Sequence, residues 1–251
     1  MTPQLFFSKK LPRDPRERFA ALEAMGYAPV FTLYQEHGDT VVRLRKPFEC
    51  PGADALIESQ PHGDAIVTDQ PGLCIGVKTA DCVPVLLWDG TAGVAAAAHA
   101  GWRGTAKDIV GKTVRVMRGE FGARHISAAI GPCVCAHCYD TGSDVPEAMP
   151  PEAFDYITMT APGRFTVDLP GINAALLRRA GVSEITMPKA CTACRPDMYW
   201  SHRRHGNDRG LQVSVIRLRS SKNLMFAEGE RAERLRTGGC AAASQAGAGG
   251  F

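Results

Sequence analysis

Three side chains that can bind a transition metal lie in short, distinctive segments of the sequence. His37 lies in Gln-Glu-His-Gly, Cys82 in Ala-Asp-Cys-Val-Pro-Val, and His99 in Ala-His-Ala-Gly-Trp-Arg-Gly. One thiolate and two imidazoles suit zinc or copper, and three protein ligands leave a fourth coordination position open. An open position is what separates a catalytic metal site from a structural one. We therefore interpret His37, Cys82 and His99 as a metal site, with zinc as the first choice and copper as the second.

The expected positions of these residues agree with this interpretation. His99 follows the apolar run Val94 to Ala98, and Cys82 follows an expected strand and a Thr-Ala-Asp turn. Loops at strand ends carry much of the chemistry of α/β folds. Spacing alone equally allows His99 to be a packed histidine and Cys82 an ordinary buried thiol, because distant ligands form no sequence signature. His62, which also precedes a glycine, is an alternative to His37 as the first ligand.

Charged and polar residues near these segments offer further contacts. Arg103 lies just before an expected helix N-terminus, where backbone N–H groups would help it to bind an anion; the alternative is a surface arginine. The segment 197–210 combines aromatic residues with histidines and arginines and could line an aromatic, anionic substrate pocket. His202 and His205 could hold a metal at their i, i+3 spacing, although a turn-rich loop favours solvated histidines. Asp168 could be either functional or a helix cap.

Four other cysteines form two C-x-x-C pairs, Cys135 with Cys138 and Cys191 with Cys194. The spacing within each pair fits a structural zinc site, but the gap between the pairs is long for a zinc ribbon. This gap favours free thiols over a metal site. A redox role is favoured less still, because neither pair begins a helix that would lower a thiol pKa. The sequence assigns no role to these four cysteines or to Cys133.

Composition excludes several classes of protein. The chain has 251 residues, of which 45% are hydrophobic and 22% charged, with a net charge of +3. A charge this small, without a block of Lys and Arg, gives no reason to expect nucleic acid as a partner. No apolar run approaches the length of a membrane span, and residues 1–10 do not resemble a secretory signal. Nine cysteines are an odd number for a disulfide framework, so we expect a reducing, cytoplasmic location.

The pattern of apolar runs predicts one layered α/β domain with a mixed central sheet and flanking helices. We expect a single catalytic domain over residues 1–236 and a disordered Gly/Ala/Ser-rich tail over 237–251. Residues 50–63 are rich in Gly, Pro and polar residues and are expected to form a loop. The expected helices span 15–25, 105–121 and 173–180, and the expected strands 29–34, 40–44, 65–68, 73–77, 83–88, 94–98, 125–130 and 211–218.

Several motifs in combination resemble those of the multicopper polyphenol oxidoreductase (laccase domain) family, whose members are also described as purine nucleoside phosphorylases. Thr-Ala-Asp-Cys-x-Pro-Val, which contains Cys82, is followed by His-Ala-Gly-Trp-Arg-Gly, which contains His99. Segments 130–139 and 191–210 also match, and the resemblance extends over about residues 34–218. It implies a single α/β fold without the cupredoxin barrels of true laccases. It also implies metal ligands at His37, Cys82 and His99.

The activity that the resemblance implies is zinc-dependent phosphorolysis of adenosine, inosine and methylthioadenosine, with adenosine deaminase activity beside it. Purine nucleoside and phosphate are then the expected partners. Arg103 is a candidate for orienting phosphate and stabilising charge. Asp81, beside Cys82, is a candidate for supporting the metal ligand or transferring a proton. Copper-dependent polyphenol oxidation fits less well, because a laccase needs roughly ten histidines for its coppers and this chain has seven.

Two other classes of function are open at this stage. A cysteine hydrolase or deamidase would use Cys82 as nucleophile and His99 as base, and the expected fold also resembles the catalytic domain of a bacterial deamidating toxin. A non-enzymatic protein that binds a metal or a partner would instead depend on Cys50, Cys74 and the C-terminal tail.

Overall fold

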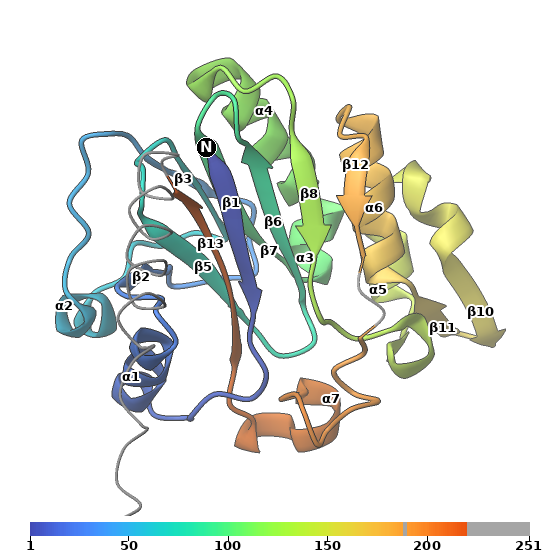
Figure 1. The fold of residues 1–251 in the computed structure, drawn as a ribbon. Coiled ribbons are helices and arrows are strands. Elements are labelled where there is room, and N and C mark those ends of the chain that lie inside the picture. The colour runs from blue at the N-terminus through green and yellow to red at the C-terminus, as the bar shows by residue number, and fades with distance from the viewer. Residues whose placement is uncertain (188–189, 220–251) are drawn as a thin grey trace, which may run out of the picture.

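The computed structural model describes residues 1–187 and 190–219. Its largest sheet has six strands in the order β12-β8-β6-β7-β4-β3 (Figure 1). The sheet is mixed: β3 and β12 run parallel to their neighbours β4 and β8, whereas the other pairs are antiparallel. The strands are β3 (Val41–Leu44), β4 (Ala65–Thr68), β6 (Val83–Asp89), β7 (Val94–Ala100), β8 (Ser127–Ile130) and β12 (Glu184–Thr186).

A second sheet, in the order β1-β13-β5-β2, packs against one face of the six-stranded sheet. The alanines of β7 show how both faces are buried. Ala95 and Ala97 pack with Ile75 and Ile216 of the second sheet, whereas Ala96 and Ala98 face the helices. Small side chains in a central strand allow the layers to approach closely. The strands of this sheet are β1 (Thr2–Phe7), β2 (Val30–Phe31), β5 (Cys74–Thr79) and β13 (Gln212–Arg219).

Helices cover the other face of the six-stranded sheet, where α4 and α6 contribute to the largest buried cluster. The helices α1 and α2 lie beside the four-stranded sheet (Figure 1). A third sheet, in the order β10-β11-β9, lies beyond α6, at the right of Figure 1. The remaining elements are α1 (Pro15–Ala24), α2 (Ala53–Glu58), α3 (Trp102–Ala106), α4 (Ile109–Phe121), η1 (Ala136–Cys138), β9 (Asp140–Thr141), α5 (Asp144–Glu147), η2 (Pro151–Tyr156), β10 (Ile157–Ala161), β11 (Arg164–Val167), α6 (Leu169–Arg179), α7 (His202–His205) and η3 (Gly206–Asp208).

The predicted mixed α/β architecture is confirmed, and several element boundaries differ from the prediction. The expected helix 105–121 is two helices, because Asp108 adopts a left-handed backbone conformation (φ 58°) and its carboxylate caps α4. The expected loop 50–63 contains α2. Strand β1 and the hairpin of β10 and β11 were not predicted. The expected tail at 237–251 lies outside the described residues, as does the expected domain boundary at residue 236.

None of the helices in the described part of the chain combines the length and apolar character needed to cross a membrane.

Candidate metal centre and active site

His37, Cys82 and His99 come together at one end of the strands of the six-stranded sheet. Each offers one ligand atom, and these atoms lie within 4.8 Å of one another. His37 is exposed, Cys82 is half-buried and His99 is buried, with 2% of its surface exposed. The rings of His37 and His99 have their centroids 4.8 Å apart at an angle of 81°. The group therefore has one side packed in the protein and one side open to solvent, and it could hold a metal ion.

Strand register explains why residues so distant in sequence meet. Val83 of β6 is paired with Ala100 of β7, so the residue before β6 (Cys82) lies beside the end of β7 that carries His99. Ala65 of β4 is paired both with Ala98 of β7 and with Val41 of β3. The loop that precedes β3 and the residue that precedes β4 therefore lie at the same strand ends as Cys82 and His99.

Asp64, the residue before β4, holds this arrangement together. Its carboxylate accepts a hydrogen bond from the Nδ1 atom of His99 at 2.8 Å. It also accepts hydrogen bonds from the backbone N–H groups of His37 at 3.0 Å and Gly38 at 2.7 Å. Sequence reasoning missed Asp64. The only available signal was an acidic residue placed directly before a strand that is apolar on both faces.

The hydrogen bond to Asp64 also selects the reactive nitrogen of His99. With Nδ1–H donating to a carboxylate, the lone pair is on Nε2, which is the form that binds a metal. The same carboxylate stabilises the backbone of His37, which adopts a left-handed conformation (φ 59°) that is uncommon outside glycine. One buried carboxylate thus orients two of the three candidate ligands.

The three groups shift one another's pKa values. Burial by itself raises the pKa of the Cys82 thiol, but the charge of His99 and hydrogen bonds from His37 and His99 lower it to about 6. Burial by itself lowers the pKa of His99, but the Cys82 thiolate and the Asp64 carboxylate raise it to about 9. The net pKa of Asp64 is lowered, since the hydrogen bonds from His99 and Gly38 outweigh its burial. Both shifts favour transfer of the thiol proton of Cys82 to the ring of His99.

Two glycines of the His-Ala-Gly-Trp-Arg-Gly motif keep space beside this group. A Cβ atom on Gly101 would lie 3.1 Å from Cδ2 of His37 and 3.2 Å from Sγ of Cys82. A Cβ atom on Gly104 would lie 2.9 Å from the carbonyl oxygen of Gly38. Any side chain at 101 would therefore fill the space between the candidate ligands. The donor set and this preserved space fit a small transition-metal ion.

A cavity of about 610 Å³ opens beside the three residues. This volume lies in the range of small-molecule sites, roughly 300–1,000 Å³. His37 and Cys82 lie in its wall, together with aromatic residues and arginines. The other lining residues are Ala80, Asp81, Trp102, Arg103, Val134, Tyr139, Leu169, His202, Arg203 and Arg209.

Asp81 lies in the wall of this cavity, and each of its carboxylate oxygens accepts a hydrogen bond from the protein. Its Oδ1 accepts a hydrogen bond from the Thr192 hydroxyl at 2.6 Å, and its Oδ2 accepts one from the backbone N–H of Arg203 at 2.7 Å. Its backbone is left-handed (φ 89°). The arrangement links the turn before Cys82 to the segment around α7.

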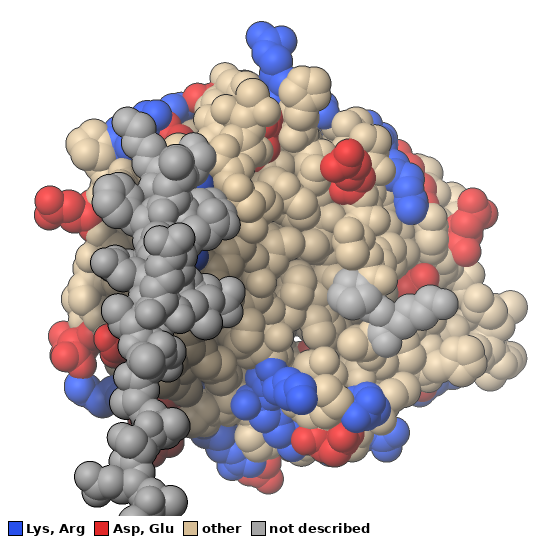
Figure 2. Space-filling view, in the orientation of Figure 1, with Lys and Arg blue, Asp and Glu red and all other residues tan. Residues whose placement is uncertain are grey.

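Three arginines give the cavity a basic end. The guanidinium of Arg103 stacks on the ring of Trp102 at 4.1 Å, and that of Arg203 lies 4.7 Å from the Tyr139 ring. The Nε atom of Arg209 is buried without a hydrogen-bond partner among the described residues. Basic side chains gather along the lower edge of the face in Figure 2, in the region where Figure 1 draws α7. This end of the cavity suits an anion.

The alternative metal ligands lie outside the cluster of His37, Cys82 and His99. His62 is exposed and pairs with the carboxylate of Glu36 at 2.8 Å, so it does not replace His37. His202 lines the cavity, and His205 Nδ1 is 3.0 Å from the carbonyl oxygen of Ser201. Among the described residues neither belongs to a cluster of potential metal ligands. Asp168 is a helix cap, whose carboxylate accepts from the Gly171 N–H at the start of α6.

The fold and this site together define a mixed α/β protein with a Cys/His cluster at the strand ends of its largest sheet, beside an open cavity. Residues 13–219 match the family described as multi-copper polyphenol oxidoreductase laccase. The chain therefore belongs to this family, as its motifs had indicated.

Relatives and solved structures agree with this assignment. The chain is 38% identical to a purine nucleoside phosphorylase of Deinococcus radiodurans, over 82% of this chain and 76% of that one. It is 36% identical to adenosine deaminase RL5 from an unknown prokaryotic organism, over 72% of both. The crystal structure of YlmD from Geobacillus stearothermophilus superposes with a TM-score of 0.77 at 27% identity, covering 87% of this chain and 92% of that one. Family members thus include proteins named as enzymes of purine nucleosides.

Proposed function

We propose that this protein is a zinc enzyme that cleaves purine nucleosides with phosphate, acting on adenosine, inosine and methylthioadenosine, and that it also deaminates adenosine. The observation that carries the proposal is the group of His37, Cys82 and His99, two members of which (His37 and Cys82) line a cavity that also contains three arginines. The names of the relatives supply the class of substrate.

His37, Cys82 and His99 would hold the zinc ion. When bound, zinc supplies a Lewis acid and lowers the pKa of a water ligand. The protein's part is twofold. His37 and His99 lower the pKa of Cys82 and so favour its thiolate, and the hydrogen bond from Nδ1 of His99 to Asp64 presents Nε2. Three protein ligands would leave a fourth position open, and two of them, His37 and Cys82, lie in the cavity wall.

The basic end of the cavity would bind phosphate. Arg103 and Arg209 offer guanidinium donors, and the Nε of Arg209 has no partner in the described part of the chain. Paired donors of this kind orient a phosphate oxygen against the anomeric carbon of the ribose and stabilise the charge that moves during cleavage. Trp102 and Tyr139 lie in the same wall, each with an arginine guanidinium over its ring, and would contact the purine there.

Asp81 would act as a positioning residue. Both of its carboxylate oxygens already accept a hydrogen bond, from the Thr192 hydroxyl and from the backbone N–H of Arg203, which favours a positioning role over proton transfer. Its role in this proposal is to hold the turn before Cys82 against the segment around α7.

A test uses protein purified without a metal-affinity column, incubated with inosine and phosphate. We expect release of hypoxanthine and ribose 1-phosphate, and conversion of adenosine to inosine in a parallel reaction. His99→Ala should abolish both reactions, whereas Cys50→Ser, at a half-buried cysteine outside the site, should not. Absence of product from zinc-loaded protein would overturn the proposal.

One observation favours a second candidate, a cysteine hydrolase or deamidase. The low pKa of Cys82 and the raised pKa of His99 describe a thiolate nucleophile paired with its acid partner. In that case the metal-free protein would be the active form. Zinc would inhibit it, and the purine nucleosides would not be cleaved.

A multicopper oxidase is less well supported. All seven histidines of the chain lie in the described residues, and only His37 and His99 belong to a cluster of potential ligands there. A laccase needs roughly ten histidines for its coppers.

A further inference from the structure

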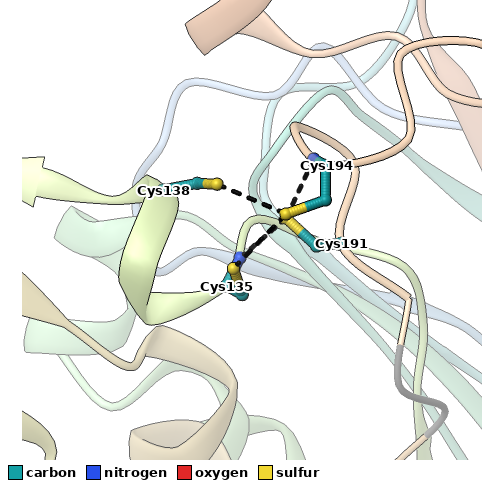
Figure 3. A group of neighbouring side chains, drawn as sticks. All are labelled: Cys135, Cys138, Cys191 and Cys194. Atoms are coloured by element: carbon teal, nitrogen blue, oxygen red, sulfur yellow. Dashed lines mark hydrogen bonds between the residues drawn. The ribbon is translucent and has the colours of Figure 1, made fainter.

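The fold brings the two C-x-x-C pairs together at a second place. Cys135 and Cys138 lie on the turn around η1, after β8, and Cys191 and Cys194 lie on the turn before α7. The four sulfur atoms lie within 4.8 Å of one another. Figure 3 shows the two turns facing each other with their side chains pointing inward. The fold thus closes the long sequence gap that argued against a shared site.

The distances suit tetrahedral coordination by four thiolates. Zinc–sulfur bonds of about 2.3 Å place the four sulfurs of a tetrahedron about 3.8 Å apart. Cys138 Sγ lies 3.5 Å from Cys194 Sγ, and Cys135 Sγ lies 4.0 Å from the same atom. These sulfur–sulfur separations lie on either side of the tetrahedral value.

The backbone around the cluster is arranged to stabilise negative sulfur. The N–H groups of Cys135 and Cys194 both donate to Sγ of Cys191, at 3.3 and 3.4 Å. Thiolate is the form that binds a metal, and hydrogen bonds to sulfur favour it. These two donors come from different turns, so both turns support the same ligand, Cys191.

The main chain also fixes the two turns to each other. Cys133 and Cys191 form a parallel β-bridge, in which the N–H of Thr192 donates to the carbonyl oxygen of Cys133 at 3.0 Å. A backbone hydrogen bond closes each turn, between the two cysteines in the first and one residue beyond Cys194 in the second. Cys138 N–H donates to Cys135 C=O at 3.0 Å, and Arg195 N–H donates to Cys191 C=O at 3.2 Å. Backbone hydrogen bonds therefore hold the two cysteine-bearing turns next to each other.

We propose that Cys135, Cys138, Cys191 and Cys194 form a second zinc site, closed and structural, in addition to the centre at His37, Cys82 and His99. Four protein ligands leave no open position, so this ion stabilises structure rather than acting on substrate. Its four ligands use all the C-x-x-C cysteines of the chain.

The site would secure one wall of the cavity. Tyr139 follows directly after Cys138, and the Thr192 hydroxyl between Cys191 and Cys194 holds the carboxylate of Asp81. The guanidinium Nε of Arg204, in α7, donates to the carbonyl oxygen of Ala193 at 2.9 Å. A metal that clamps the two turns therefore fixes Tyr139 and Asp81, two residues of the cavity wall.

Metal analysis of the full chain tests this inference. We expect about two zinc ions per chain, falling to about one in the double variant Cys138→Ser/Cys194→Ser. His99→Ala should lose the other ion and keep this one. The matched control is Cys50→Ser, which changes a half-buried cysteine outside both clusters and should keep both.

Cobalt substitution gives an independent reading of the ligands. The thiolate-to-cobalt absorption of the full chain should fall strongly in the double variant, because a four-thiolate site absorbs far more than a site with one thiolate. Hydrogen exchange should also become faster over 133–141 and 190–205 in that variant. About one zinc ion per chain in the unchanged protein, lost on His99→Ala, would overturn the inference even if the double variant failed to fold. So would a disulfide among the four cysteines in protein isolated with reductant.

Discussion

The carboxylate of Asp64 and the imidazole of His99 form a buried hydrogen-bonded pair, with Oδ1 and Nδ1 separated by 2.8 Å. The same carboxylate accepts hydrogen bonds from the backbone of His37 and Gly38, so it orders two separate segments of the candidate metal centre. Asp64 is 1% exposed, so solvent cannot replace these contacts. The candidate metal centre therefore depends on a residue that does not itself belong to the proposed ligand set.

Replacing Asp64 by Asn should weaken zinc binding at His37, Cys82 and His99. The amide carries no charge to hold Nδ1–H of His99, and its NH₂ group cannot accept from the backbone. Loss of such a supporting partner typically lowers metal affinity by about 10- to 100-fold. Competition against a chromophoric chelator measures this affinity. The control is Glu36→Gln, which removes an exposed carboxylate of the same loop; equal affinities for the two variants would contradict the role of Asp64.

Replacing Gly101 by Ala should close the space between the ligands. The backbone there (φ −68°, ψ 172°) accepts alanine without strain, so the effect isolates crowding by the new Cβ against His37 and Cys82. We expect weaker zinc binding with the fold retained. Gly119→Ala is the matched control, because a Cβ there meets nothing within 4 Å, and in a helix it should stabilise by up to about 1 kcal/mol. Unchanged zinc affinity in Gly101→Ala would show that this space is not needed.

Replacing Arg103 by Gln should raise the KM for phosphate more than the KM for nucleoside. A hydrogen bond to a charged group contributes about 1.5–3 kcal/mol, which corresponds to roughly 10- to 100-fold. Initial rates with phosphate and inosine varied separately give the two constants. Arg124→Gln changes an exposed arginine outside the cavity and should leave both constants unchanged. If Arg103→Gln instead raised only the KM for nucleoside, Arg103 would not be a phosphate contact.

Alkylation of Cys82 in chelator-treated protein should remain fast down to about pH 6. The pKa of this thiol is lowered to about 6, so thiolate persists above that pH and is lost as pH falls through it. An ordinary cysteine slows below about pH 8.5. Mass spectrometry of the peptide that contains Cys82 gives the rate, and Cys82→Ser gives the background from other thiols. Zinc should protect the residue; rapid alkylation in zinc-loaded protein would support the hydrolase alternative.

Much of the site could be predicted from sequence because its parts lie in specific motifs. His99, Gly101 and Arg103 fall within one run of seven residues, and Cys82 lies in another. The α/β class followed from short apolar runs buried on both faces. Asp64 was missed because its contacts depend on strand register, which places β4 beside β7 and cannot be read from local pattern.

The four-cysteine cluster shows the same limit more clearly. Spacing within each pair was informative, but the gap from Cys138 to Cys191 argued against a shared site. That gap contains α6 and the sheet of β9, β10 and β11, and the chain returns to the bridge of Cys133 with Cys191 only after them. The split between α3 and α4 was hidden for a different reason. The left-handed backbone of Asp108 interrupts a helical apolar pattern without any Gly or Pro to mark it.

The most direct test of the central claim is to restore zinc to metal-stripped protein while measuring hypoxanthine release from inosine and phosphate. The unchanged chain should be inactive when stripped and regain activity as zinc is added, whereas His99→Ala should remain inactive at every zinc concentration. Equal activity of the stripped and zinc-loaded chain, or full activity of His99→Ala, would contradict a catalytic zinc at His37, Cys82 and His99.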